Sequence, residues 1–176
     1  QNTVGYKSPS LGGLTVQAAV GLGEGTIAGG RDAGINAIYA AGPIYAGIGY
    51  GKKTGGTVAN DGNTLVNLAF NYDFGVAKLM TYYGRSKSGI GSSATNKFYS
   101  LGAQAPIGPG LLKAAYGRLD VPGSNQALDV KKFAVGYNYN LSKRTNLYAD
   151  MGSATGRAAN GTKGERNTAY AFGLRH

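Results

Sequence analysis

Apolar and polar residues alternate along much of this chain with a period of two. The stretch TLVNLAFNY, residues 64–72, shows the pattern: from position 66 on, valine, leucine, phenylalanine and tyrosine take the even positions, and asparagine or alanine takes the odd ones. Residues 14–22 and 132–139 repeat it. Strict alternation over such lengths predicts strands with one apolar and one polar face.

Eleven segments of this kind are expected, and most have 8–12 residues. They lie near 1–7, 14–22, 33–41, 44–51, 64–72, 76–85, 97–106, 111–120, 129–140, 144–152 and 166–176. Strands of soluble domains centre near about 5–6 residues, whereas tilted strands that cross a bilayer need about 9–11. Strand length therefore favours a membrane barrel, and no helical stripe of apolar residues competes with it.

The predicted connections alternate between short and long. The short ones are 8–13, 42–43, 73–75, 107–110 and 141–143, and the long ones are 23–32, 52–63, 86–96, 121–128 and 153–165. Short turns on one side and long loops on the other are typical of outer-membrane barrels. The fold class predicted is all-β, a transmembrane antiparallel up-and-down β-barrel, with residues 1–176 in one domain and the C-terminus on the periplasmic side.

The polar faces are predicted to line a water-filled pore, because the apolar faces must meet lipid and every backbone group must be paired. The predicted lining residues are the basic Lys78, Lys113, Lys132, Arg144 and Arg175, the single acidic Asp150, and the neutral Asn67, Asn71, Tyr82, Asn138, Asn146 and Tyr148. Further polar-face residues are Thr15, Gln17, Asn36, Ser100, Gln104 and Asn167. Fixed positive charge in a lumen raises the local anion concentration, so we expect a preference for anions.

Aromatic residues are expected to form two belts at the membrane interfaces. Near the long loops these are Tyr50, Tyr83, Tyr116 and Phe133, and near the short turns they are Tyr39, Tyr72, Phe74, Tyr139 and Phe172. The alternative is that tyrosine is present only because it suits strands.

The net charge of +10, from 18 basic and 8 acidic residues, could indicate a nucleic-acid-binding protein. The basic doublets at 52–53, 131–132 and 143–144 are spread along the chain, which does not favour that class. His176 is the only histidine and there is no cysteine, which excludes a histidine-based catalytic triad or a metal site of several His or Cys ligands within this chain. No catalytic residue, cofactor or metal is predicted.

Eleven strands pose a problem, because bacterial single-chain barrels have even strand counts. An open sheet edge in lipid would leave backbone groups unpaired. We therefore expect either that one strand is miscounted or that the chain is an N-terminally truncated portion of a larger barrel.

Three stretches are similar to one known family. Residues 2–14 (NTVGYKSPSLGGL), 139–148 (YNLSKRTNLY) and 170–176 (YAFGLRH) resemble a mid-chain strand and turn, a late turn and the closing strand of Gram-negative trimeric general porins. The resemblance is strongest to the anion-selective porins of β-proteobacteria. It implies a sixteen-stranded barrel, of which this chain would supply strands six to sixteen.

The resemblance also implies a homotrimer in the outer membrane and passive diffusion of small anions and hydrophilic solutes. Implied partners are membrane lipid, lipopolysaccharide and the barrel-assembly machinery. That machinery reads a terminal phenylalanine in the family, which is absent after His176, so we expect a trimmed chain. The constriction loop of the family would lie N-terminal of this region.

Two other functional classes are alternatives to a channel. A structural or adhesive barrel would need a filled lumen and would show no conductance. A barrel enzyme would need a cluster of Ser, His and Asp residues, which the sequence lacks.

Overall fold

The computed structural model describes residues 2–23, 30–55, 61–89, 94–122, 128–158 and 161–176. This part of the chain forms a single sheet of eleven strands. Their bounds are β1 Asn2–Lys7, β2 Leu14–Leu22, β3 Arg31–Ala41, β4 Ile44–Thr54, β5 Thr64–Asp73, β6 Lys78–Lys87, β7 Thr95–Ile107, β8 Gly110–Asp120, β9 Leu128–Asn140, β10 Asn146–Ala158 and β11 Lys163–Arg175.

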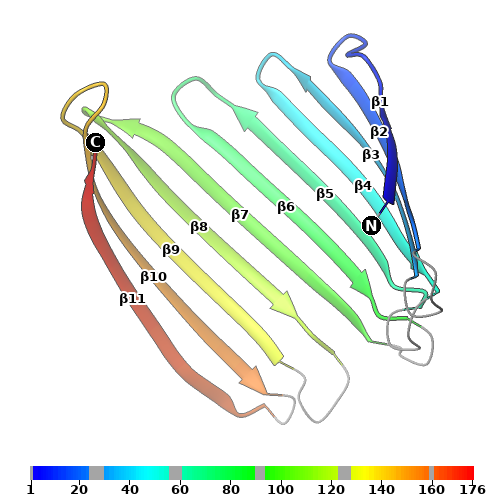
Figure 1. Ribbon diagram of the computed structural model, residues 1–176. Helices are drawn as coiled ribbons and strands as arrows, with labels where there is room; N and C mark the ends of the chain where they lie inside the picture. Colours follow the sequence, from blue (N-terminus) through cyan, green and yellow to red (C-terminus); the bar gives the residue numbers. More distant parts are fainter. Residues whose placement is uncertain (1, 24–29, 56–60, 90–93, 123–127, 159–160) are drawn as a thin grey trace.

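Each strand pairs antiparallel with the next strand in the chain, in the order β1 to β11. Figure 1 shows the strands side by side and tilted in one curved layer, with the short turns along one edge and the strand ends that lead into the longer connections along the other. We call these edges the short-turn end and the long-loop end. The order confirms the predicted up-and-down antiparallel fold. Within the described ranges there is no helix that is long and apolar enough to cross a membrane.

The sheet has one layer and therefore no second layer to pack against. Among the described residues, no hydrophobic side chain is buried. Large apolar side chains stay open instead, as Leu101 (50% exposed) and Phe133 (46% exposed) illustrate. A soluble domain would bury such side chains in a core, so the sheet needs an apolar environment on one side.

Two short turns share the same Gly-Pro sequence and join β3 to β4 and β7 to β8. Gly42 and Gly108 have φ of 54° and 58°, a backbone region that glycine enters without the Cβ clash of other residues. Each is followed by proline, whose ring fixes φ near the value that the second turn position needs. Tight two-residue turns of this kind hold the register of the long strands that they join.

The eleven predicted segments all correspond to strands, but several ends differ. β6 begins at Lys78 rather than at 76, because the N–H of Phe74 donates to the carbonyl of Ala77 (2.8 Å) and closes a turn there. β10 begins at Asn146 rather than at 144, because the N–H of Leu141 donates to the carbonyl of Thr145 (2.9 Å).

The strands also run further into the predicted long loops than expected. β4 continues to Thr54, β10 to Ala158, and β11 starts at Lys163. In these extensions both faces carry polar or small residues, so the apolar alternation that marks a strand is missing from the sequence. The central parts of the predicted loops, residues 24–29, 56–60, 90–93, 123–127 and 159–160, lie outside the described residues.

Candidate functional site

The backbone register assigns each strand residue to one of two faces. Residues directly opposite each other on successive strands form a row, and all members of a row lie on the same face because side chains alternate with a period of two. One row crosses seven strands and contains Asp73, Lys78, Gln104, Lys113, Gly136, Asp150 and Ala171. We call the face that carries this row the polar face, and the opposite one the apolar face.

The polar face gathers the predicted lining residues. The register places on it Lys78, Lys113, Lys132, Arg175, Asp150, Asn67, Asn71, Tyr82, Asn138, Asn146 and Tyr148. Thr15, Gln17, Asn36, Ser100, Gln104 and Asn167 lie there too. Whether this face lines a pore stays a prediction at this point.

Arg144 is the one predicted lining residue that the register does not place on the polar face. It lies in the turn from Leu141 to Thr145, outside any strand, so the alternation assigns it to neither face. Its backbone N–H donates to the Ser142 hydroxyl (3.2 Å), which helps to shape the turn. A role for Arg144 at the mouth of a pore remains a prediction.

Sequence reasoning missed four charged residues that the register pairs on the polar face. Asp32 and Lys53 are opposite each other on β3 and β4, Asp73 is opposite Lys78, and Lys7 is opposite Gln17. Asp150 was expected to be the only acidic residue on this face, but Asp32 and Asp73 share it. Asp32, Lys53 and Asp73 lie just outside the predicted segments, where the apolar alternation had ended.

Lys113 and Asp150 flank Gly136 in the row that crosses β8, β9 and β10. The Lys113 ammonium donates to the side-chain oxygen of Asn138 (3.2 Å), one position closer to the short turns on the same face. The Asp150 carboxylate occupies the space above Gly136, where a Cβ would overlap it. The missing side chain of Gly136 thus gives room to the Asp150 carboxylate on the polar face.

Tyr148 and Arg175 form a second cluster near the short-turn end. The Arg175 guanidinium lies 4.4 Å from the centroid of the Tyr148 ring, a cation–π arrangement. The same ring covers Gly173 on β11, since a Cβ there would lie 2.7 Å from the Tyr148 hydroxyl oxygen. The glycine allows the ring to approach the backbone of β11 closely, and the ring contacts the guanidinium of Arg175 on this face.

The apolar face carries the predicted interfacial aromatics. The register places there Tyr50, Tyr72, Tyr83, Tyr116, Phe133, Tyr139 and Phe172. Two pairs of rings are in contact: Tyr72 and Phe74 have centroids 4.6 Å apart, and Tyr83 and Tyr99 have centroids 5.2 Å apart. Tyr83 and Phe133 lie well inside their strands, because the strands continue beyond them toward the long loops.

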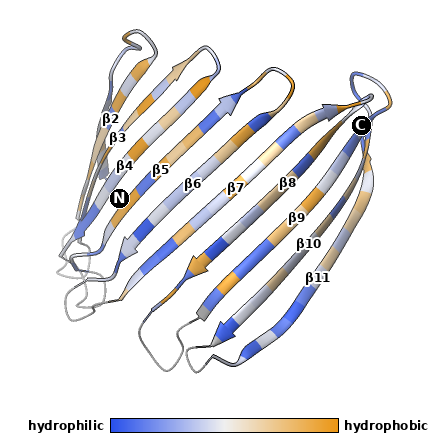
Figure 2. Ribbon diagram, turned by 180° about the vertical axis from the view of Figure 1, so that it is seen from behind, coloured by the Kyte–Doolittle hydropathy of each residue, from blue (hydrophilic) through white to orange (hydrophobic). Residues whose placement is uncertain are grey.

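Figure 2 shows hydrophilic residues concentrated at the long-loop ends of β6 to β11. At those ends even the apolar face carries charged residues. In the half of the apolar face that is nearer the short turns, no described strand residue is charged. The apolar face thus has an uncharged band next to the short turns and a charged margin beyond it.

A catalytic or metal centre would need clustered ligands or nucleophiles. No group of three or more His, Cys, Asp or Glu residues that could hold a metal occurs in the described part of the chain. The ring nitrogen Nδ1 of His176 lies 2.8 Å from the Thr145 hydroxyl, against the turn between β9 and β10. This contact ties the end of β11 to a short turn.

Residues 1–159 match the model of a known family, described as Gram-negative porin. The outer membrane porin protein 32 of Delftia acidovorans is 32% identical over 99% of this chain. The chain covers 56% of that protein, so it spans about half the length of the curated relatives that it matches.

Solved structures of outer-membrane proteins also superimpose on nearly the whole chain. An anion-selective porin from Comamonas acidovorans superimposes with a TM-score of 0.80 at 27% identity, over 99% of this chain and 59% of that one. OmpT of Vibrio cholerae in its trimer form superimposes with a TM-score of 0.71 at 15% identity, over 98% of this chain and 62% of that one. The second likeness supports the fold alone.

Proposed function

The chain belongs to the Gram-negative porin family, and from this premise we propose that it forms the greater part of a water-filled channel for small hydrophilic solutes and ions. As a member of this family it lies in the outer membrane of a Gram-negative bacterium. The polar face lines the lumen and the apolar face meets lipid. The separation of the two kinds of residue onto opposite faces of one sheet is the observation that supports this proposal.

The sheet is closed into a barrel by further strands of the same protein. The outer edges of β1 and β11 have no partner strand among the described residues, and unpaired edges are not tolerated in the hydrocarbon region of a membrane. The relatives are nearly twice as long as the matched region. Residues 1–176 are therefore one part of a single barrel domain.

The lumen prefers anions. Basic residues on the polar face outnumber the acidic ones. Lys7, Lys53, Lys78, Lys113, Lys132 and Arg175 lie at paired positions against Asp32, Asp73 and Asp150, with Glu165 beside the register shift of β11. Fixed charge of one sign raises the local concentration of the opposite ion. The similar porin from Comamonas acidovorans is named anion-selective, which supports the same preference here.

The partners follow from the membrane setting. A homotrimer is proposed because an outer membrane protein of the same fold was solved in a trimer form. Lipopolysaccharide is proposed as the lipid next to the long-loop end, and the barrel-assembly machinery as the factor that inserts the strands. No catalysis is proposed, and no cofactor is needed for passive diffusion.

The test is planar-bilayer conductance of the full-length protein under a KCl gradient. We expect stepwise, ohmic conductance with a reversal potential toward that of chloride. Replacing Lys78, Lys113 and Lys132 with Gln shifts the reversal potential toward that of potassium, because three fixed positive charges leave the lumen. A correctly folded barrel without conductance would contradict the channel and favour a structural or adhesive role.

A further inference from the structure

The polar face carries a cluster of large apolar side chains on β6 to β9. Tyr82 lies in one row of this face, and Phe98, Leu119 and Val130 lie in the next row toward the long-loop end. We call these four residues the luminal apolar cluster. Most other residues of the two rows are polar, charged or small. Side chains on this face point into the lumen of the proposed channel, so contact with lipid does not explain the cluster.

Two glycines let the rings of the cluster lie close to the backbone. A Cβ on Gly84 would lie 3.2 Å from a ring carbon of Tyr82, and a Cβ on Gly117 would lie 3.7 Å from a ring carbon of Phe98. The Tyr82 and Phe98 rings contact each other, with centroids 5.6 Å apart and ring planes at 57°. Aromatic pairs favour such tilted contacts over a face-to-face sandwich. The two rings therefore stabilise each other against the wall.

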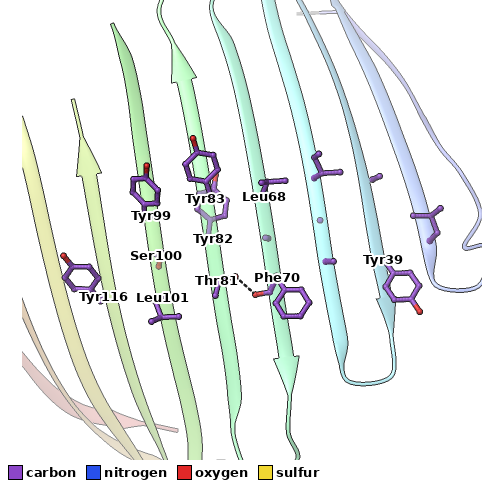
Figure 3. A pocket seen from close by; sticks show the side chains of 16 residues that line it. Tyr39, Leu68, Phe70, Thr81, Tyr82, Tyr83, Tyr99, Ser100, Leu101 and Tyr116 are labelled. Carbon is purple, nitrogen blue, oxygen red and sulfur yellow. Dashed lines mark hydrogen bonds between the residues drawn. The ribbon is translucent and has the colours of Figure 1, made fainter. Parts of the chain in front are cut away.

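Both rings stay open on the polar face. Tyr82 and Phe98 are each 38% exposed. The ring pair of Tyr83 and Tyr99 on the apolar face (Figure 3) meets lipid in the proposed channel, whereas the luminal pair meets water. Contiguous apolar surface that is exposed to water commonly marks a binding site. A position inside the lumen restricts the ligand to a solute that is small enough to enter the channel.

One basic side chain lies beside the cluster. Lys132 on β9 is directly opposite Gly117, the glycine under the Phe98 ring, so the backbone of the lysine and the backbone under the ring are about 4.8 Å apart. Lys132 is exposed, and in the described part of the chain no ion pair occupies its ammonium. The paired positions of the two rows contain no acidic residue. The cluster thus presents an aromatic surface next to an accessible positive charge.

We propose that the luminal apolar cluster and Lys132 together bind small aromatic anions of the benzoate class inside the channel. The ring of the solute packs against Phe98 and Tyr82, and its carboxylate accepts a hydrogen bond from the Lys132 ammonium. An apolar lining with a single charged group is usual for sites that bind small molecules. Contact between rings adds affinity beyond that of the buried area. The site rests on the proposed function, since it requires the polar face to line a lumen that solutes enter.

The test measures how benzoate and cyclohexanecarboxylate reduce the chloride current through the full-length protein in planar bilayers. The two anions have the same charge and nearly the same size, but only benzoate has an aromatic ring. A solute that is held in the lumen obstructs the flow of chloride. We expect benzoate to halve the current at a concentration about two- to tenfold lower than cyclohexanecarboxylate does, which is the range that ring contact contributes.

Three variants locate the site. Phe98→Leu keeps an apolar side chain but removes a ring, so the half-blocking concentration of benzoate should rise about two- to tenfold and that of cyclohexanecarboxylate should stay nearly the same. Tyr99→Leu is the matched control, since it removes a ring from the apolar face one residue away, and it should change neither value. Lys132→Gln should weaken the block by both anions equally, by roughly two- to fivefold, because both share the carboxylate that the lysine binds.

Equal block by the two anions in the wild-type protein would overturn the proposed site, as would equal behaviour of the Phe98→Leu and Tyr99→Leu variants. The current without added aromatic anion separates this proposal from the channel itself. A protein that conducts chloride but is not blocked by benzoate refutes the aromatic site alone. A folded barrel without conductance refutes the channel, and the site with it.

Discussion

The difference between the two faces of the sheet is clearest when residues that are neighbours in the chain are compared. On β8, β9 and β10 one row holds Lys113, Gly136 and Asp150, and the adjacent row on the other face holds Ala114, Val135 and Met151. Both rows belong to the same antiparallel ladders, in which each residue pairs its backbone groups with one neighbouring strand or the other. Side-chain composition alone therefore decides which face suits water and which suits lipid, and a register slip of one residue would exchange the two.

The largest expected effect comes from placing a charge on the apolar face. Val135→Arg puts a guanidinium in the uncharged band between Phe133 and Tyr139 and should cost about 2–4 kcal/mol of folding free energy if that band lies at the bilayer centre. Ala134→Arg, one residue away, points to the polar face beside Ala115 and Gly152 and should cost far less. Denaturant titration in lipid vesicles measures both, and equal costs would contradict the assignment of the faces.

A smaller effect is expected from filling the space under a ring on the polar face. Gly173→Ala places a methyl group against Tyr148, and overpacking of this kind costs about 1–3 kcal/mol. Gly152→Ala is the control, since its Cβ would meet only the Phe133 carbonyl oxygen, at 3.9 Å. Denaturant titration should show a loss for the first variant only. In a Tyr148→Ala background, the Gly173→Ala substitution should lose most of its cost, because the ring that it overpacks is gone.

The smallest effect on stability concerns Arg175. Arg175→Gln removes the cation–π contact with Tyr148 and should cost about 0.5–1 kcal/mol. It also removes a positive charge from the polar face, so the reversal potential should move toward that of potassium. Arg166→Gln, which removes a charge from the apolar side of the same strand, should leave the reversal potential unchanged. A shift of equal size in both variants would mean that selectivity does not depend on which face carries the charge.

The sequence predicted the middle of each strand better than its ends. Within the bilayer region the alternation of β5 is nearly complete, and its predicted range, 64–72, differs from the observed Thr64–Asp73 by one residue. β10 was expected to end at 152 but continues to Ala158. The sequence did not predict this extension, because beyond the apolar band the residues on both faces are polar or small. The extension forms because it pairs with β9 and β11. Such pairing cannot be predicted from the residues of one strand alone.

The same limit explains which candidate residues were missed. Lys78, Lys113 and Asp150 lie within clear alternation, and the register places all three in one row on one face of the sheet. Asp32 and Lys53 lie in the polar extensions, where only the register between β3 and β4 assigns a face. Arg144 was placed on a strand, but hydrogen bonds within the turn from Leu141 to Thr145 hold it outside.

The most direct test of the central claim is the accessibility of single cysteines during conductance. Residues 1–176 contain no cysteine, so Ala115→Cys on the polar face and Ala114→Cys on the apolar face each add the only thiol in this part of the full-length protein. A small, anionic, water-soluble methanethiosulfonate reagent should react with the thiol at position 115 and reduce the current. At position 114 it should leave the current unchanged. Reaction at 114 with protection at 115 would show that the apolar face lines the water-filled space, and would contradict the account.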